Sequence, residues 1–149
     1  MPAEYETILV PTDGSEGIER VLDHALRLAR DHDATVHALN VVDQRLVRAA
    51  EEETREEIAT DLRERGDRAV AAVEDLAGEE GVAVTTAVRE GVPDREIRAY
   101  ADEVGADVVV LGTHGRTGRD RLASLGSVTE RVVTDAERPV FVVQVGRSE

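Results

Sequence analysis

The chain contains no cysteine, no tryptophan and no lysine among its 149 residues. Without cysteine it can form neither disulfide bonds nor thiolate metal sites. Only one phenylalanine and two tyrosines are present, so the core must be built from Val, Leu, Ile and Ala. The same scarcity argues against the aromatic stacking platforms that bind single-stranded nucleic acids.

Long apolar runs are also missing. The longest wholly apolar segments, such as 108–111 and 140–143, are far shorter than the roughly 20 residues that cross a bilayer. The first residues lack the basic segment followed by an apolar one that is typical of a secretory signal. These features predict a soluble, cytoplasmic protein that does not bind membranes.

Acidic residues greatly outnumber basic ones. There are 32 Asp and Glu against 18 cations, all of them arginine, and the formal net charge is −14. This charge repels nucleic-acid backbones and anionic lipids, so we expect no nucleic-acid partner. Abundant carboxylates, absent lysine and small core residues are typical of a halophilic protein from a high-salt cytoplasm. A mesophile with a GC-rich genome would also favour Arg and Ala, so both origins remain open.

Short apolar runs alternate with longer helical patterns, which is the signature of βαβ units. We expect a helix from Glu16 capped by Ser15, a long charged helical stretch over Asp43–Ala77 with a weak point at Gly66, and helices near 94–104 and 127–135. The predicted fold is α/β, with residues 1–149 forming one domain: a Rossmann-like open sheet of five mainly parallel strands with helices on both faces. The five strands are expected at Thr7–Val10, Ala34–Val42, Val82–Val88, Asp107–Leu111 and Val140–Val145.

Two strand-to-helix loops carry residues suited to ligand binding. Right-handed crossovers bring such loops to one edge of the sheet, where ligands bind. The first loop contains Pro11, Thr12, Asp13 and Gly14, with a carboxylate and a glycine before a helix N-terminus. An ordinary turn with good capping residues would have the same sequence, so this loop alone does not decide between the two interpretations.

The second loop runs from Gly112 to Thr129 and combines glycines with a cluster of arginines. Arg116, Arg119 and Arg121 lie within six residues of one another in a strongly acidic chain, and guanidinium groups beside a glycine-rich turn suit a polyphosphate. The segment is not a Walker A loop, which needs lysine, and it does not follow the first strand as a dinucleotide fingerprint would. The alternative interpretation remains open: the glycines only form turns, and the arginines only pair with neighbouring carboxylates.

Six segments of the sequence, in the same order along the chain, resemble motifs of the universal stress protein family, and the resemblance covers nearly the whole chain. They are Val10–Ser15, Ala38–Asp43, Arg89–Pro93, Ala106–Arg116, Gly126–Val132 and Arg138–Val140. The ATP-binding branch of that family has Gly, two residues, Gly, nine residues, and then Gly-Ser or Gly-Thr. Gly112 and Gly115 have the first spacing, but ten residues separate Gly115 from Gly126, so the loop is one residue longer than the family pattern.

The resemblance implies a binding site for ATP, or for ADP or AMP, with Mg²⁺ or Mn²⁺ held mainly by phosphates and water. Val41 would bind adenine through its backbone, and His114 would shape the loop or touch the nucleotide without a catalytic role. No catalytic residue and no protein metal ligand is expected. The implied nucleotide-binding residues are Pro11, Thr12, Asp13, Val41, Gly112, His114, Gly115, Arg116, Gly126, Ser127, Val128 and Thr129.

Three functions remain open at this point. The protein could be an ATP-binding regulator of the stress response, a slow ATPase or self-phosphorylating protein with Ser127 or Thr129 as acceptor, or a nucleotide-free interaction protein. The last strand, Val140–Val145, is almost wholly apolar and holds the only phenylalanine. An edge strand of this kind favours pairing with a second copy, as the family resemblance also implies, so we expect a homodimer.

Overall fold

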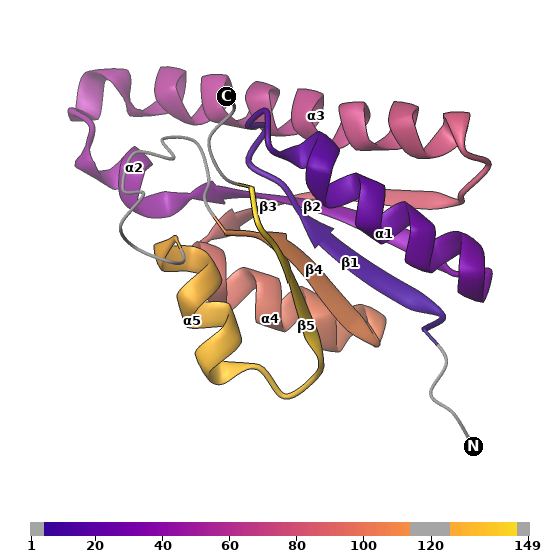
Figure 1. The fold of residues 1–149 in the computed structure, drawn as a ribbon. Coiled ribbons are helices and arrows are strands. Elements are labelled where there is room, and N and C mark those ends of the chain that lie inside the picture. The colour runs from indigo at the N-terminus through magenta and orange to yellow at the C-terminus, as the bar shows by residue number, and fades with distance from the viewer. Residues whose placement is uncertain (1–4, 114–125, 146–149) are drawn as a thin grey trace.

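The computed structural model describes residues 5–113 and 126–145. Strands and helices alternate along the chain (Figure 1). In order they are β1 (Thr7–Pro11), α1 (Ile18–His32), β2 (Thr35–Asp43), α2 (Gln44–Ala49), the 3₁₀ turn η1 (Glu52–Thr54), α3 (Arg55–Glu79), β3 (Val84–Gly91), α4 (Pro93–Val104), β4 (Val108–Gly112), α5 (Ser127–Asp135) and β5 (Val140–Val143).

All described strands belong to one parallel sheet with the order β3-β2-β1-β4-β5. The chain adds β2 and β3 on one side of β1 and then returns to add β4 and β5 on the other. The strand order therefore reverses between β1 and β4, which pair through Ile8–Val108 and Leu9–Val109. These features confirm the predicted α/β open sheet and place a topological switch point in its centre.

Helices cover both faces of the sheet (Figure 1). The side chains of β1 alternate between the two faces: Ile8 and Val10 contact the α1 and α3 layer, and Leu9 contacts the α4 and α5 layer. All three are fully buried. The first core is built entirely from Val, Leu, Ile and Ala, and Tyr100 is the one buried aromatic residue of the second. A core almost without aromatics is what the composition requires.

Several local predictions differ from the structure. The predicted helical stretch over Asp43–Ala77 is interrupted, because α2 ends at Ala49 and α3 begins at Arg55 after the 3₁₀ turn Glu52–Thr54. Strand β3 ends at Gly91, three residues later than predicted. Helix α1 begins at Ile18 with Gly17 as its N-cap, while Ser15 contributes its backbone carbonyl, which accepts the Ile18 N–H at 3.2 Å. Gly66 does not interrupt α3, because it is a buried packing residue of an unbroken helix. The last strand ends at Val143, two residues earlier than predicted.

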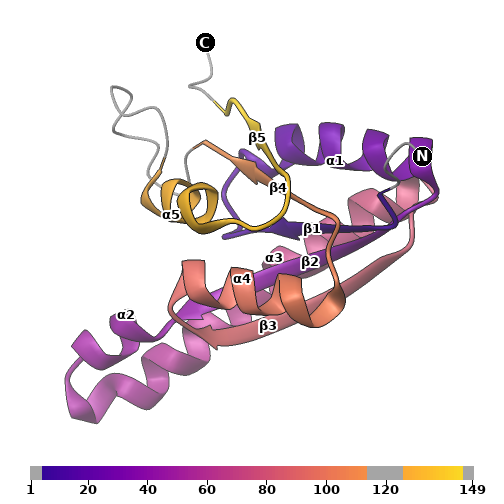
Figure 2. The same ribbon diagram turned by 90° about the horizontal axis from the view of Figure 1, so that it is seen from below.

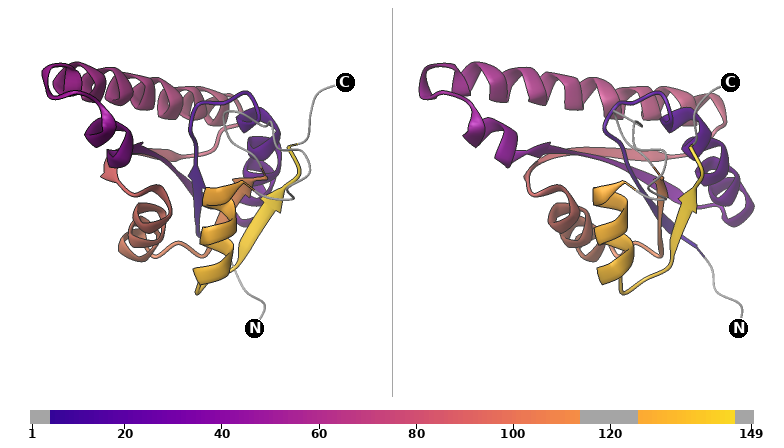
Figure 3. Two further views of the ribbon diagram at one scale, coloured as in Figure 1. Left: turned by 90° about the vertical axis from the view of Figure 1, so that its left-hand side faces the viewer. Right: turned by 60° about the vertical axis from the view of Figure 1, so that its left-hand side comes forward.

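The first part of the α2–α3 region extends beyond the sheet. Figures 2 and 3 show α2 and the beginning of α3 projecting past the ends of β2 and β3. We call residues 44–65 the arm. No residue of the arm is buried, and Gly66 is the first buried residue of α3. Gly66 therefore marks the point where α3 reaches the sheet.

Candidate functional site

The loop after β1 is held by backbone and side-chain hydrogen bonds. The Thr12 N–H donates to the Leu39 carbonyl of β2 at 2.8 Å, and the Thr12 carbonyl accepts from Asn40 Nδ2 at 2.9 Å. Within the loop, the Gly14 N–H donates to Thr12 Oγ1 at 3.1 Å. Thr12 and Asn40 are both buried. The path of the chain from Pro11 to Gly14 is thus fixed against the neighbouring strand.

The backbone of Val41 extends past the end of β1. The pairing of the two strands ends at Pro11 and Leu39, while β2 continues to Asp43. Backbone groups two residues apart on a strand point to the same side, so the N–H and C=O of Val41 point toward β1 like those of Leu39. The Val41 side chain packs against the α4 and α5 core. The Val41 N–H and C=O therefore lie beyond the end of β1, where they can bind a ligand at the switch point.

The start of α5 is tied to the end of β4. Thr129 is buried, and its hydroxyl donates to the Gly112 carbonyl at 2.7 Å. The Gly126 N–H donates to the Thr113 carbonyl. The hydroxyl of Thr113 accepts the Val145 N–H at 3.0 Å. These bonds bring the beginning of α5 and the end of β5 to the same edge of the sheet as the β1 loop.

The first turn of α5 directs backbone N–H groups out of the helix end. Gly126 is the N-cap, with φ −69° and ψ 163°, and no side-chain cap is present among the described residues. Ser127 is exposed and Val128 is half-buried. The N–H groups of a helix start and its dipole favour anions. The predicted residues Gly126, Ser127, Val128 and Thr129 therefore form a helix start suited to phosphate.

The predicted residues His114, Gly115 and Arg116 lie outside the described residues, as does the extra loop residue. The other nine lie at the carboxyl edge of the sheet, on the β1 loop, on β2, at the end of β4 and at the start of α5. Asp13 is exposed, and its Oδ1 accepts the Ser15 N–H at 2.9 Å.

Three ion pairs border this edge. The Arg45 guanidinium donates to both carboxylate oxygens of Asp43, at 2.9 and 2.8 Å, and these bonds lower the pKa of Asp43. Asp94, in the first turn of α4, is buried and accepts from Arg98 Nη2 at 3.1 Å. Arg131 of α5 lies 4.0 Å from the same carboxylate. The carboxylates are thus neutralised locally, which reduces their repulsion of an anionic ligand.

The described residues contain no group of three or more His, Cys, Asp or Glu that could hold a metal ion.

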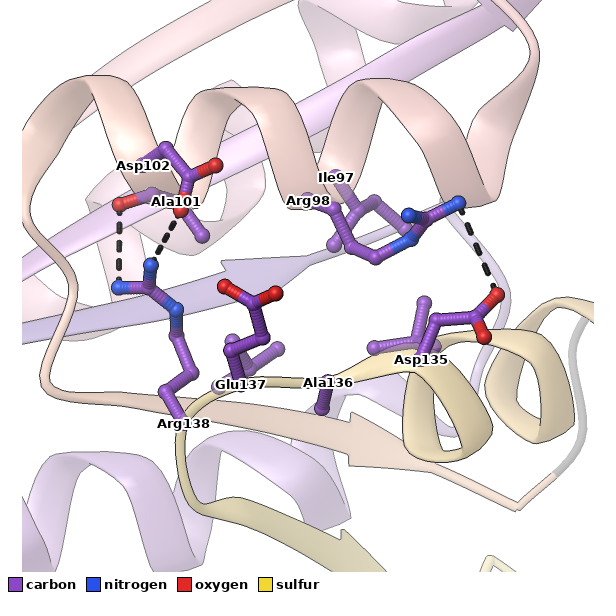
Figure 4. Close-up of a pocket in the computed structure, with 10 residues that line it drawn as sticks. Ile97, Arg98, Ala101, Asp102, Asp135, Ala136, Glu137 and Arg138 are labelled. Atoms are coloured by element: carbon purple, nitrogen blue, oxygen red, sulfur yellow. Dashed lines mark hydrogen bonds and ion pairs between the residues drawn. The ribbon is translucent and has the colours of Figure 1, made fainter.

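A cavity of about 100 Å³ lies between α4, α5 and the segment leading to β5, toward the amino ends of the strands (Figure 4). Arg98 and Arg138 flank it. None of the predicted nucleotide-binding residues lines this cavity. In the described part of the chain, no helix is long and apolar enough to span a membrane.

Sequence reasoning missed Asn40, Thr113 and the structural role of the Thr129 hydroxyl. A signal was present for Asn40, since it is the one polar side chain within the apolar run 38–42. A polar residue in a strand buried on both faces needs a hydrogen-bond partner. Thr113 had no comparable signal, because its partner, the Val145 N–H, is 32 residues away in the sequence.

Comparison with known proteins confirms the family resemblance over nearly the whole chain. The universal stress protein family model matches residues 4–144. Universal stress protein MJ0531 of Methanocaldococcus jannaschii is 41% identical over 146 residues, covering 97% of this chain and 85% of that protein. The structure of MJ0577 from the same organism has a TM-score of 0.85 at 31% identity and covers 99% of both chains.

Two similar structures contain nucleotides. A universal stress protein in complex with cAMP has a TM-score of 0.72 at 25% identity and covers 97% of this chain and 100% of that one. The universal stress protein from Archaeoglobus fulgidus in complex with dAMP has a TM-score of 0.63 at 25% identity and covers 95% of this chain and 99% of that one. By the match of the family model and the identity to MJ0531, this chain belongs to the universal stress protein family.

Proposed function

We propose that this protein binds an adenine nucleotide, namely ATP or else ADP or AMP, at the carboxyl edge of the sheet, and that nucleotide occupancy regulates its partners in a stress response. One observation supports the proposal above all. The β1 loop, the Val41 backbone and the start of α5 all lie at the carboxyl edge of the sheet, at the switch point between β1 and β4. The nucleotide complexes of two relatives, with cAMP and dAMP, support an adenine nucleotide as the ligand.

Each part of the edge would have a separate task. The Val41 backbone would bind the adenine edge, beside Pro11 and Thr12. The first-turn N–H groups of α5 would bind phosphate oxygens. Because the described residues offer no metal-binding cluster, Mg²⁺ or Mn²⁺ would be held mainly by the phosphates and water. Residues 115 and 116 would complete the phosphate site.

Calorimetric titration of the purified protein with ATP, ADP and AMP, in molar salt with Mg²⁺, tests the proposal. Binding of ATP at ~100 times its dissociation constant should raise the free energy of unfolding by about 2.7 kcal/mol. Mass spectrometry of small molecules released on denaturation would identify nucleotide retained through purification. If no nucleotide produces heat and none is retained, the protein is a nucleotide-free interaction protein of the same fold.

Self-phosphorylation is a second candidate, and the structure separates its two predicted acceptors. The Thr129 hydroxyl is buried and donates to the Gly112 carbonyl, whereas Ser127 is exposed at the helix start. Ser127 is therefore the better placed acceptor. Incubation with labelled ATP should give label that disappears in Ser127→Ala, and phosphate release above the protein-free rate would indicate hydrolysis. Absence of both leaves binding alone.

We also propose that two copies pair through β5. This strand is an edge of the sheet, bonded to β4 on one side only among the described strands. Phe141 is 39% exposed and lies beside His24 of α1, with ring centroids 5.6 Å apart. Pairing across a two-fold axis would satisfy both exposed strand edges and bury Phe141.

Light scattering at tens of micromolar protein in molar salt tests this dimer. We expect twice the chain mass for the wild-type protein and a monomer for Val142→Pro, because proline removes a ladder donor from an edge strand. A wild-type monomer with and without ATP contradicts the dimer. A Val142→Pro variant that remains dimeric places the interface elsewhere.

The acidic surface leads us to propose adaptation to concentrated salt. The net charge of −14 destabilises the compact chain by self-repulsion when counterions are few. The melting temperature should therefore rise steeply from ~0.1 M to molar salt. A melting temperature independent of salt contradicts the halophilic origin and favours the mesophilic one.

A further inference from the structure

Helix α3 approaches the β1 loop more closely than a side chain would permit. A Cβ atom added to Gly66 would lie 3.0 Å from Asn40 Cγ, closer still to its Oδ1, and 3.2 Å from Val88 Cγ1. One turn further, Ala69 would lie 3.4 Å from a Cβ added to Gly14, whose φ is +83°. Gly66 and Ala69, three positions apart and therefore on one face of α3, thus allow the helix to pack closely against Asn40 and against the β1 loop at Gly14.

Asn40 connects this helix to the loop. Its side chain lies on the α3 side of β2, 8% exposed, with the carboxamide against Gly66. From there Nδ2 reaches the Thr12 carbonyl at 2.9 Å. Together with the bond from the Thr12 N–H to Leu39, it fixes the peptide groups on both sides of the Thr12 α-carbon. Loss of this buried donor would free the segment that leads to Asp13.

We propose that Asn40, held in place by Gly66 of α3, is a positioning residue that fixes the Thr12–Asp13 loop for nucleotide binding. This inference rests on the proposed nucleotide site, although Asn40 and Gly66 themselves are not assigned any contact with the ligand. Gly66 is also the first buried residue after the arm, so the support of the loop lies at the base of the arm.

Two glycines of α3 provide a matched pair of variants. Gly66→Ala places a methyl group against the Asn40 carboxamide, whereas a Cβ at Gly78 meets no atom within 4 Å. Both changes replace glycine by a better helix former, Gly66 inside α3 and Gly78 in its last turn. Gly78→Ala should raise the melting temperature and leave ATP binding unchanged. Gly66→Ala should weaken ATP binding about tenfold or more, equivalent to about 1.4 kcal/mol, and should speed amide exchange at Thr12 in the nucleotide-free protein.

Asn40→Ala and the double variant Asn40→Ala/Gly66→Ala separate positioning from packing. Asn40→Ala should weaken ATP binding and speed exchange at Thr12. In the double variant the added methyl group no longer meets a carboxamide, and only its 3.2 Å contact with Val88 Cγ1 must relax. The melting temperature should therefore lie close to that of Asn40→Ala. ATP affinity should stay as low as in Asn40→Ala. These variants remain informative even if Gly66→Ala alone fails to fold.

The outcomes distinguish this inference from the proposed function. If Asn40→Ala melts at a lower temperature but keeps wild-type ATP affinity and wild-type exchange at Thr12, Asn40 has only a packing role and the inference is overturned. If the wild-type protein binds neither ATP nor AMP, the proposed function fails. In that case the amide-exchange rate at Thr12 still tests whether Asn40 fixes the loop. A wild-type rate in Asn40→Ala would contradict that role, and a faster rate would support it.

Discussion

The two ends of the sheet use polar side chains differently. Four of the five buried polar or charged residues of the described chain lie beyond the carboxyl ends of strands, namely Thr12, Asp94, Thr113 and Thr129, and the fifth, Asn40, lies in the carboxyl half of β2. At the amino end, the polar contacts come from partly exposed charged groups that join backbone segments. Asp107 accepts the N–H groups of Glu6 and Thr7 at 2.9 and 3.0 Å, and Arg138 donates to the carbonyls of Ala101 and Ala106.

The difference shows where the fold buries polar groups, which costs free energy. Burying a polar group destabilises a protein unless a hydrogen bond compensates it. At the carboxyl end each buried residue has such a partner, and most of these partners are backbone groups of loops and helix starts. These bonds shape the candidate site. The amino-end bonds close the fold, so changes at the two ends should affect different measurements.

The largest expected effect is at the carboxyl end, in Gly126→Val. The φ of Gly126 is −69°, which a branched residue can adopt, so the fold should persist. The valine side chain would stand where the backbone must approach the phosphates, and ATP affinity should fall about 100-fold, equivalent to about 2.7 kcal/mol. Calorimetry on the folded variant measures this change. Wild-type affinity would mean that the longer 115–126 loop moves the phosphates away from Gly126.

At the amino end, Arg138→Met should have the opposite profile. The variant keeps an apolar stem of similar length but loses the donors to Ala101, Ala106 and Asp102. These carbonyls are partly buried, and Ala101 keeps the Ala106 N–H as a donor, so the loss of Arg138 should lower the free energy of unfolding by about 1–2 kcal/mol, measured by urea denaturation. ATP affinity should not change.

A matched substitution checks the Arg138 result. Arg63→Met removes the same type of side chain from an ion pair with Glu90 in which both side chains are about half exposed. The loss should be below about 1 kcal/mol. Equal losses in the two variants, or an affinity change in Arg138→Met, would contradict the division between the two ends.

Much of this architecture could be predicted from local sequence patterns. Apolar runs ending at Pro11, Asp43 and Gly112 identified strands, and the residues after them identified the edge that carries the site. The predictions failed where a distant contact decides the structure. The sequence predicts a weak point at Gly66, because glycine has low helix propensity. Its packing against Asn40, across 26 positions of sequence, gives it the opposite role.

The site was predictable to the extent that it depends on loop sequence. Pro11, Thr12 and Gly126 lie where the strand-end argument placed them. The side-chain hydrogen bonds that support the site join different elements: Asn40 of β2 donates to the Thr12 carbonyl, and Thr129 in the first turn of α5 donates to the Gly112 carbonyl of β4. Such partners depend on three-dimensional proximity. The family resemblance could identify the residues but not the bonds that support them.

The smallest expected effect concerns His37, which lies between the two ends on β2. Its Nδ1 is 3.3 Å from the Tyr100 hydroxyl, and burial lowers the pKa of His37 from its ordinary value of 6.5. Arg89 lies over the Tyr100 ring at 4.9 Å and pairs with Glu103 at 2.7 Å. The cationic Arg89 adds no stabilisation to a protonated His37, so the neutral imidazole is the form suited to this position.

The sign of the pH dependence follows from this lowered pKa. As pH falls through 6.5, the unfolded chain binds a proton at this position before the folded chain does, so the stability that neutral His37 contributes is lost. The melting temperature should therefore fall modestly between about pH 7.5 and 5.5, and His37→Gln should reduce that slope. The Arg89 bond lowers the pKa of Glu103 below 4.5, so its contribution is lost only at more acidic pH. Parallel melting curves for wild type and His37→Gln over the upper window would show that His37 titrates equally in the folded and unfolded chains.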